Sequence, residues 1–173
     1  MTAETEIRFV IDLETTGLFP LESRITCISI LSIENEIPAS FYGEDEKKIL
    51  EQFWNSVKKC KAVITFNGDN FDLPFLIQRS LLLGVKIRND LVNIDLKKIV
   101  NGFKYSNSVY VKGSLRKWAE LFNWPVDTTD GMGMIKLYEE KNWEEIKRHC
   151  NEDVKLTHAL FARCVNCGLI DLD

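Results

Sequence analysis

Short apolar runs rich in β-branched residues predict a β-sheet in the first part of the chain. The runs cover residues 7–13, 25–33 and about 39–42, and each has the length and composition of a strand. Pro38 separates the last two runs. Residues 62–66 form a further short apolar run that predicts a buried strand.

Apolar residues at helical spacing follow the first three strands. Residues 46–57 carry apolar side chains three and four positions apart, namely Ile49, Leu50, Phe53, Trp54 and Val57, so one face of a helix is expected to pack on the sheet. After the turn-forming residues 67–70, a second helix is expected over 73–83, with Pro74 tolerated in its first turn. This succession of strand, turn and helix predicts an α/β fold.

The second half of the chain has a mainly helical pattern. Helices are expected over residues 94–100, 114–122, 132–140 and 143 to about 164. Residues 105–113 alternate in polarity and predict either an extended segment or a loop over a binding site. With no linker or internal repeat in its 173 residues, the chain is expected to form one domain, residues 1–173.

Composition adds that the protein is expected to be cytoplasmic, with no membrane partner. The chain starts with no basic and apolar signal segment, and no apolar run approaches the length of a bilayer span. Its five cysteines are an odd number scattered among apolar residues, which predicts reduced thiols. Cys164 and Cys167 form a C-x-x-C pair, but a zinc site needs a second pair.

The net charge of −4 provides no overall attraction to nucleic acid, yet residues 96–119 contain no acid. This segment carries the basic residues Lys97, Lys98, Lys104, Lys112, Arg116 and Lys117, interleaved with Phe103, Tyr105, Tyr110 and Trp118. Cations that follow phosphates and rings that stack on bases suit a single-stranded nucleic acid. The alternative is a solvated basic face over core aromatics.

Asp12 and Glu14 end the first apolar run, just before Gly17. Alternate residues of a strand point to one face, so both carboxylates are expected to project together. Neighbouring carboxylates raise each other's pKa, and a divalent cation removes that cost. The alternative is an acid pair at a solvated strand end.

Asp72 begins the second helix, where free N–H groups favour its ionised form. The alternative is that Asp72 serves only as an N-cap. In the last helix, Asp153 falls on the apolar stripe of Ile146, Cys150, Thr157, Leu160 and Cys164, and His149 lies one turn before it. A simple helix-surface pair of His149 and Asp153 is the alternative here.

Asp12, Glu14, Asp72 and Asp153 offer oxygen ligands that select Mg²⁺ or Mn²⁺ over zinc. Two such ions about 4 Å apart can activate a water and stabilise the departing oxygen of a phosphodiester. Whether the four acids meet in space cannot be decided from spacing.

The motifs Asp12-x-Glu14, Asn67-x-x-x-Phe71-Asp72 and His149-x-x-x-Asp153, in this order, resemble the three motifs of the DEDD superfamily of 3'-5' exonucleases. Residues 66–76 are particularly similar to the proofreading domain of family B DNA polymerases and to related stand-alone exonucleases. The resemblance runs from about Ile7 to Phe161. It implies a ribonuclease H-like fold with a mixed central sheet flanked by helices and a helical C-terminal half.

The same resemblance implies that the four acids bind two metal ions and that His149 orients or deprotonates a water. Here the chain departs from the family: one branch has Tyr four residues before the last Asp, and the other has His five before it. The chain has His at the spacing of Tyr, and one extra helical residue would rotate the side chain by about 100°. We therefore assign the tyrosine-type layout with His149 substituted.

The expected function is a 3'-5' exonuclease that releases nucleoside 5'-monophosphates from single-stranded 3' ends, with DNA favoured and RNA possible. The resemblance implies substrate contacts from Thr15, Thr16, Gly17, Leu18, Asn67 and Phe71. The alternatives are that Phe71 is a core residue and that the first four form a simple turn. Lys112, Arg116 and Lys117 are further candidates from the basic segment. A replication or repair partner protein is possible, and the alternatives are a weakly active binding or assembly subunit and an endonuclease.

Overall fold

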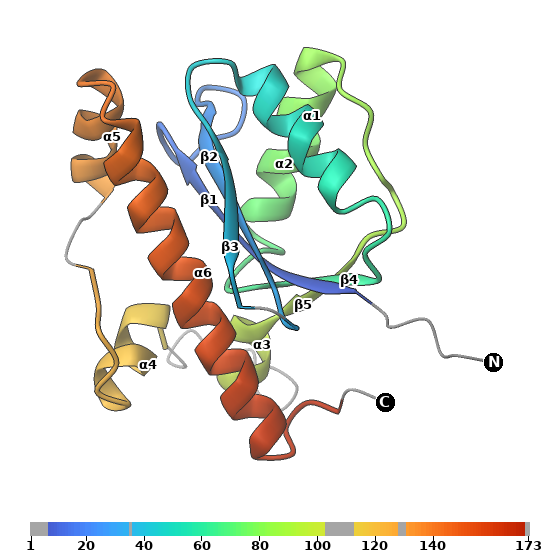
Figure 1. Cartoon of the computed structure of the whole chain (residues 1–173), viewed down its shortest axis with the longest axis vertical. Helices are drawn as coiled ribbons and strands as arrows, with labels where there is room; N and C mark the ends of the chain where they lie inside the picture. Colours follow the sequence, from blue (N-terminus) through green and yellow to red (C-terminus); the bar gives the residue numbers. More distant parts are fainter. Residues whose placement is uncertain (1–6, 35, 103–112, 128–130, 172–173) are drawn as a thin grey trace.

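The computed structural model describes residues 7–34, 36–102, 113–127 and 131–171. Figure 1 shows a sheet between two helical layers. The elements in chain order are β1 (Arg8–Thr15), β2 (Ile25–Ser32), β3 (Pro38–Tyr42), α1 (Glu46–Ser56), β4 (Ala62–Thr65), α2 (Asp72–Leu83), β5 (Val92–Asp95), α3 (Leu96–Val100), α4 (Leu115–Leu121), α5 (Gly131–Glu139) and α6 (Trp143–Asn166).

The five strands form one mixed sheet in the order β3-β2-β1-β4-β5. β2 pairs antiparallel with both β1 and β3, whereas β4 pairs parallel with β1 and β5. β1 is therefore the central strand, and its C-terminal end carries the first acidic motif. The α/β fold with a mixed sheet is confirmed.

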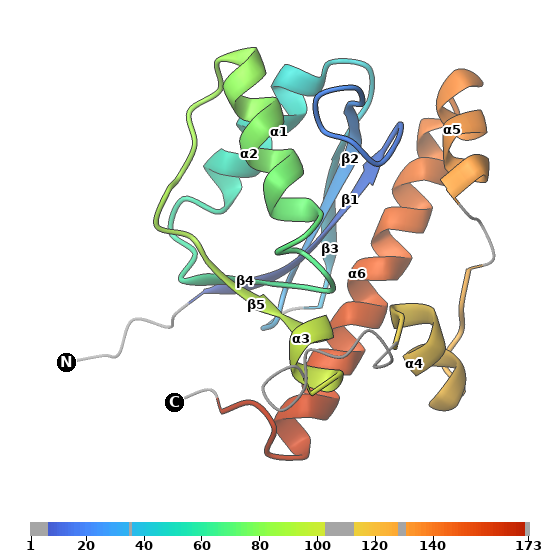
Figure 2. The same cartoon turned by 180° about the vertical axis from the view of Figure 1, so that it is seen from behind.

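The two faces of β1 pack against different helices. Ile11 and Leu13 join the core cluster formed with α1 and α2, whereas Val10 joins the cluster formed with α6. Because side chains alternate along a strand, Asp12 and Glu14 share the α6 face with Val10. Seen from behind in Figure 2, α6 runs along this face while α1 and α2 cover the opposite one.

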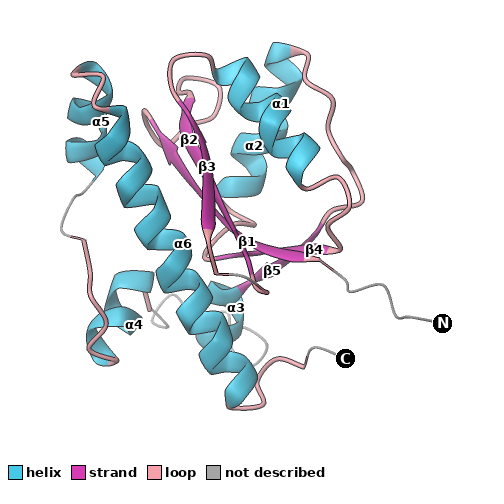
Figure 3. Cartoon of the chain, in the orientation of Figure 1, coloured by secondary structure: helices cyan, strands magenta, loops and turns pink. Residues whose placement is uncertain are grey.

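The predicted strands and helices match the structure except near residue 94. The predicted extended segment or loop over residues 105–113 lies, except for Gly113, outside the described residues. The expected helix over 94–100 is wrong in its first part, because residues 92–95 form β5 and only 96–100 form α3. Asn and Asp are poor strand formers, so the parallel pairing with β4 imposes this short strand. Pro38 does not simply separate two strands: it is the first residue of β3, paired with Leu31, where an edge strand tolerates proline. Figure 3 shows the alternation of strands and helices.

The last helix, α6, is the longest described element and packs along one face of the sheet. It begins after Asn142, whose side chain accepts a hydrogen bond from the Glu145 amide. Its buried stripe includes Ile146, Cys150 and Val154. In the described residues, no helix is long and apolar enough to cross a bilayer.

A buried ion pair ties the α1–α2 layer to the loop that follows β1. Glu46 is only 3% exposed and accepts two hydrogen bonds from Arg79, at 2.8 and 2.7 Å. Glu46 also accepts the Ile25 amide at 2.8 Å, and Arg79 donates to the Pro20 carbonyl at 3.1 Å. The Glu46 carboxylate thus connects the start of α1 to the middle of α2 and to the β1–β2 loop.

Glu46→Ala is expected to lower the free energy of unfolding by about 3–5 kcal/mol, because it leaves the Arg79 charge in a largely buried place without its partner. Urea denaturation measures this change. The matched control is Asp90→Ala, which breaks the Arg88–Asp90 pair, in which Asp90 is 71% exposed, and should cost less than about 1 kcal/mol. Equal losses in the two variants would contradict the assigned importance of Glu46.

Candidate active site

Asp12 and Glu14 project from β1 toward α6. Glu14 is 8% exposed, and Asp12 lies partly buried beside it. The two residues are separated by Leu13, which points into the opposite core. The predicted common orientation of the two acids is therefore what the strand produces, and a solvated strand end does not describe it.

Asp72 is the first residue of α2 and is only 4% exposed. The N-cap position belongs to Phe71, which makes no side-chain capping bond, so capping alone does not explain Asp72. Hydrogen bonds from the backbone amides of Leu13 and Asp72 itself act on its carboxyl group. The Leu13 amide connects the start of α2 directly to the acidic end of β1.

His149 and Asp153 face the same acids from α6. His149 Nδ1 lies 2.7 Å from Glu14 Oε1 and 3.9 Å from Asp153 Oδ2. The side chains of His149 and Asp153 are 12% and 31% exposed, respectively. Since the shorter contact of His149 is to another element, a simple pair on the helix surface does not describe this histidine.

The electrostatics show that the four acids share one site. The pKa of Asp12 is raised well above its ordinary value by burial, and then by the charges of Asp153, Glu14 and Asp72. Burial, with a further contribution from Asp95 and Glu14, raises the pKa of Asp72 to about 7. Burial likewise raises the pKa of Asp153 to about 6, against the lowering effect of His149.

Three of the four acids, all but Asp72, belong to donor groups that fit a divalent cation. Two groups of three donors have ligand atoms within 4.8 Å of one another: Asp12, Glu14 and Cys150, and Glu14, His149 and Asp153. A cation would offset the repulsion that raises the carboxyl pKa values. Glu14 belongs to both groups and joins them into one centre.

A buried residue that the sequence did not reveal, Asp95, positions the loop before Asp72. It is 5% exposed and accepts hydrogen bonds from the amides of Asn67 at 2.8 Å, Asp69 at 3.2 Å and Lys97 at 3.0 Å. The available signal is an aspartate directly before residues 96–100, which is the pattern of a helix N-cap. The predicted helix over 94–100 includes Asp95 in its first turn and therefore misses this signal.

Asn67 and Phe71, two predicted substrate contacts, lie at the two ends of one loop and have different surroundings. Asn67 has a left-handed backbone, with φ 76°, and its side-chain oxygen accepts a hydrogen bond from Lys97 Nζ at 3.1 Å. Phe71 packs against the α1–α2 core, with its ring centroid 4.9 Å from that of Phe75. Phe71 thus packs against the core while it stays partly exposed, and its contact with substrate remains a prediction.

The residues after β1 form the turn into β2. Thr15 Oγ1 donates to the Gly17 carbonyl at 2.7 Å, and Thr16 Oγ1 accepts the Arg24 amide at 3.1 Å. A Cβ at Gly17 would overlap the Ser23 hydroxyl, so a larger residue would require the Ser23 side chain to rotate away. Leu18, by contrast, is 74% exposed at the loop surface.

The basic segment is only partly described. Lys112 lies outside the described residues, as do Phe103, Lys104, Tyr105 and Tyr110. Arg116 donates to the Asp127 carbonyl at 2.7 Å, and Lys117 lies 3.5 Å from Glu120. The structure does not bring these two residues into contact with the acids.

Other members of the basic segment have local partners. Lys98 Nζ lies 2.6 Å from Asp69, and Trp118 packs in the core beside Phe122 at 5.9 Å between ring centroids. Trp118 thus has a packing role. The Asp127 carbonyl accepts the hydrogen bond from Arg116, and its carboxylate lies 2.8 Å from Arg148 of α6. Arg148 directly precedes His149 in the sequence.

Comparison with known proteins agrees with this fold. The family model described as the RNase_H superfamily matches residues 9–165. An uncharacterized protein of Methanocaldococcus jannaschii is 35% identical over 177 residues, covering 94% of this chain and 97% of its own length. The chain belongs to the ribonuclease H superfamily.

DNA polymerases provide the other similarities. The DNA polymerase of Thermococcus litoralis is 44% identical over 54 residues, which is 30% of this chain and 3% of that protein. A family B DNA polymerase from Pyrobaculum calidifontis matches in structure with a TM-score of 0.77 and 19% identity, over 96% of this chain and 25% of that chain. The chain thus spans a small part of these polymerases, and the resemblance to family B DNA polymerases is confirmed.

In the absence of metal, the unfolding free energy is expected to fall as pH rises from about 4 to about 7. The folded-state pKa values of Asp72, about 7, and Asp153, about 6, exceed the ordinary value of 3.8 for an aspartate. The folded state therefore binds more protons than the unfolded state across this window. The loss is on the order of a few kcal/mol.

Denaturation at pH 5 and pH 8 with EDTA measures this loss. Mg²⁺ should restore stability at pH 8 by mass action, and Asp72→Asn should flatten the metal-free pH dependence. Asp90→Asn, at a carboxyl whose pKa is lowered by Arg88, is the control and should leave the slope in place. A pH dependence unchanged by Asp72→Asn would show that the Asp72 carboxyl does not cause the loss of stability at higher pH.

Proposed function

We propose that the protein is a metal-dependent 3'-5' exonuclease that hydrolyses single-stranded nucleic acid, DNA rather than RNA by preference, to nucleoside 5'-monophosphates. The observation that carries this proposal is the convergence of four acids from three elements. Asp12 and Glu14 of β1, Asp72 of α2 and Asp153 of α6 act on one another electrostatically. Membership of the ribonuclease H superfamily supports it.

Asp12, Glu14, Asp72 and Asp153 would hold two Mg²⁺ or Mn²⁺ ions, because hard carboxylate oxygens suit these cations. When bound, such ions supply Lewis-acid activation of a water and neutralise charge at the leaving 3'-oxygen. The protein's own contribution is to hold four repelling carboxylates in place. The helical layers packed on the two faces of the sheet hold in place the strand and helices that carry these carboxylates.

In this proposal, His149 would accept the proton of the attacking water. A neutral ring that donates its Nδ1 proton to Glu14 Oε1, at 2.7 Å, presents Nε2 as the basic nitrogen. The Glu14 carboxylate also fixes the orientation of the imidazole. A tyrosine in the same place could orient a water but would be a poor base.

Substrate DNA is favoured because several relatives are DNA polymerases, among them that of Pyrococcus horikoshii, 27% identical over 150 residues covering 72% of this chain and 12% of that protein. The single strand would reach the acids past Thr15, Thr16, Gly17, Leu18 and Asn67. Arg116 and Lys117 of α4 would guide the strand. Asp127 connects α4 to α6, because it contacts both Arg116 and Arg148. The protein would act alone, in repair or RNA processing, or assist a replication or repair partner.

Digestion of end-labelled single strands with Mg²⁺ or Mn²⁺ tests the reaction. The expected result is a ladder that shortens from the 3' end in the wild type and is lost by at least about 10³-fold in Asp12→Ala, since a metal ligand is removed. Asp90→Ala serves as the control. Equal inertness of wild type and Asp12→Ala would favour a binding or assembly subunit, and cleavage of circular single strands would identify an endonuclease.

His149→Ala is expected to lower turnover by about 10²–10⁴-fold, the usual contribution of a general base, while Mg²⁺ affinity measured by calorimetry changes little. His149→Tyr should retain an intermediate rate, because tyrosine can still orient a water. His158→Ala, nine residues further along α6, is the matched control. Near-wild-type turnover in His149→Ala across neutral pH would remove His149 from the mechanism.

A further inference from the structure

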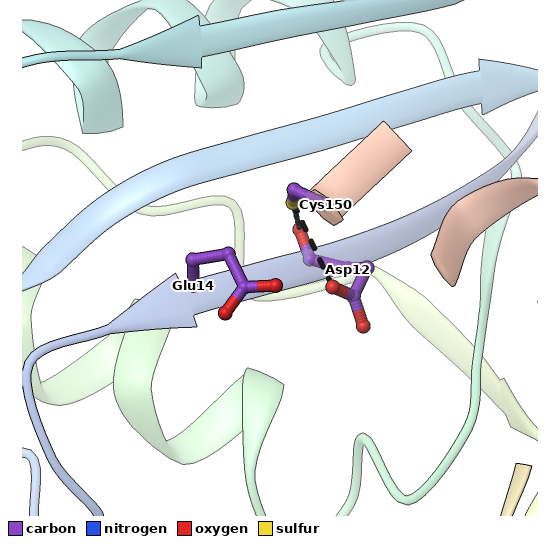
Figure 4. A group of neighbouring side chains, drawn as sticks. All are labelled: Asp12, Glu14 and Cys150. Atoms are coloured by element: carbon purple, nitrogen blue, oxygen red, sulfur yellow. Dashed lines mark hydrogen bonds between the residues drawn. The ribbon is translucent and has the colours of Figure 1, made fainter. Parts of the chain in front are cut away.

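A thiol lies directly against the acidic centre. Cys150 is 0% exposed, and its Sγ is 3.4 Å from the Asp12 carbonyl oxygen and 3.6 Å from Asp12 Oδ2. Figure 4 shows the sulfur reaching β1 from α6, with the Glu14 carboxylate turned toward Asp12. The thiol follows His149 in sequence, so the same turn of α6 offers the site one imidazole and one sulfur.

The separation of sulfur and oxygen suits a shared ion. In a tetrahedral zinc site, with Zn–S of about 2.3 Å and Zn–O of about 2.1 Å, the two ligand atoms lie about 3.6 Å apart. Cys150 Sγ and Asp12 Oδ2 are 3.6 Å apart. Glu14 adds a third donor, with all three ligand atoms within 4.8 Å of one another.

The donors differ in the ions that they favour. Carboxylates alone suit Mg²⁺ and Mn²⁺, whereas a thiolate with carboxylates suits Zn²⁺ and Cd²⁺. The adjoining group of Glu14, His149 and Asp153 adds an imidazole, a common ligand for zinc. Sulfur and nitrogen thus enter a centre whose oxygens suit harder ions.

We propose that Cys150 is a latent ligand for soft divalent cations, so that Zn²⁺ or Cd²⁺ is captured by Cys150, Asp12 and Glu14. The proposal rests on the proposed function in taking Asp12 and Glu14 as metal ligands. With Mg²⁺, the thiol keeps its proton and donates to Asp12. With Cd²⁺, the sulfur–metal bond forms as the thiol proton passes to solvent, with no oxidation or reduction.

This arrangement makes soft cations inhibitors of the enzyme. A captured ion occupies Asp12 and Glu14 with a sulfur ligand that the reaction does not use, and the two carboxylates are then withheld from Mg²⁺. Removal of the sulfur should weaken this capture by at least about tenfold. The same change should leave Mg²⁺ affinity within about threefold, because Mg²⁺ has little affinity for sulfur.

Cys60 provides the matched control. It is also buried, at 1% exposed, but it lies in the core cluster on the opposite face of the sheet, where its Sγ donates to the Ala62 carbonyl at 2.8 Å. Cys167 is exposed and would bind Cd²⁺ adventitiously, so every variant is made in a Cys167→Ser background. Cys150→Ser and Cys150→Ala are both prepared, and thermal melting establishes that each folds.

Titration of the metal-free protein with Cd²⁺ is followed by the ultraviolet sulfur-to-cadmium charge-transfer band. The band is expected in the parent and in Cys60→Ser. It is expected to be absent in both Cys150 variants and to weaken in Asp12→Asn. Retention of the band in the Cys150 variants, or its loss in Cys60→Ser, would overturn the proposal. Digestion with Mg²⁺ in parallel separates the two claims: a band without nuclease activity contradicts only the proposed function, and activity without a band contradicts only the thiol ligand.

Discussion

Electrostatic repulsion between buried carboxylates is the constraint around which this molecule is organised. Asp12, Asp72 and Asp153 have raised pKa values because they are removed from water and face other negative charges. Such a cluster opposes folding unless packing elsewhere is strong enough to hold it. The central strand supplies that strength, since β1 has a paired neighbour on each side and a packed helical layer on each face.

His149 changes the character of the cluster. Its ring lies 2.7 Å from Glu14, so the residue that departs from the family pattern also contacts the acid shared by both donor groups. In the proposed mechanism, a basic nitrogen at this point would connect proton transfer to the electrostatics of the acids. Substitution of Tyr by His would then alter both the chemistry of the water and the environment of Glu14.

The sheet and most helices could be predicted because their signals are local. Alternation in residues 8–15 and apolar stripes in residues 46–56 and 143–166 follow directly from the periods of strand and helix. β5 could not be predicted, since its pairing with β4 is a tertiary contact that overrides weak strand propensity. The acids could be identified as candidates, but their meeting, the packing role of Phe71 and the contact of Cys150 with Asp12 depend on how α6 crosses the sheet.

The two halves of the site are far apart along the chain. Glu14 and His149 are separated by 135 positions, so their contact closes a loop that includes nearly every other element. The entropy of closing so long a loop is repaid only when the intervening layers have packed. The centre therefore has no local precursor, and a chain with an ordered sheet but an undocked last helix would present only half of its donors.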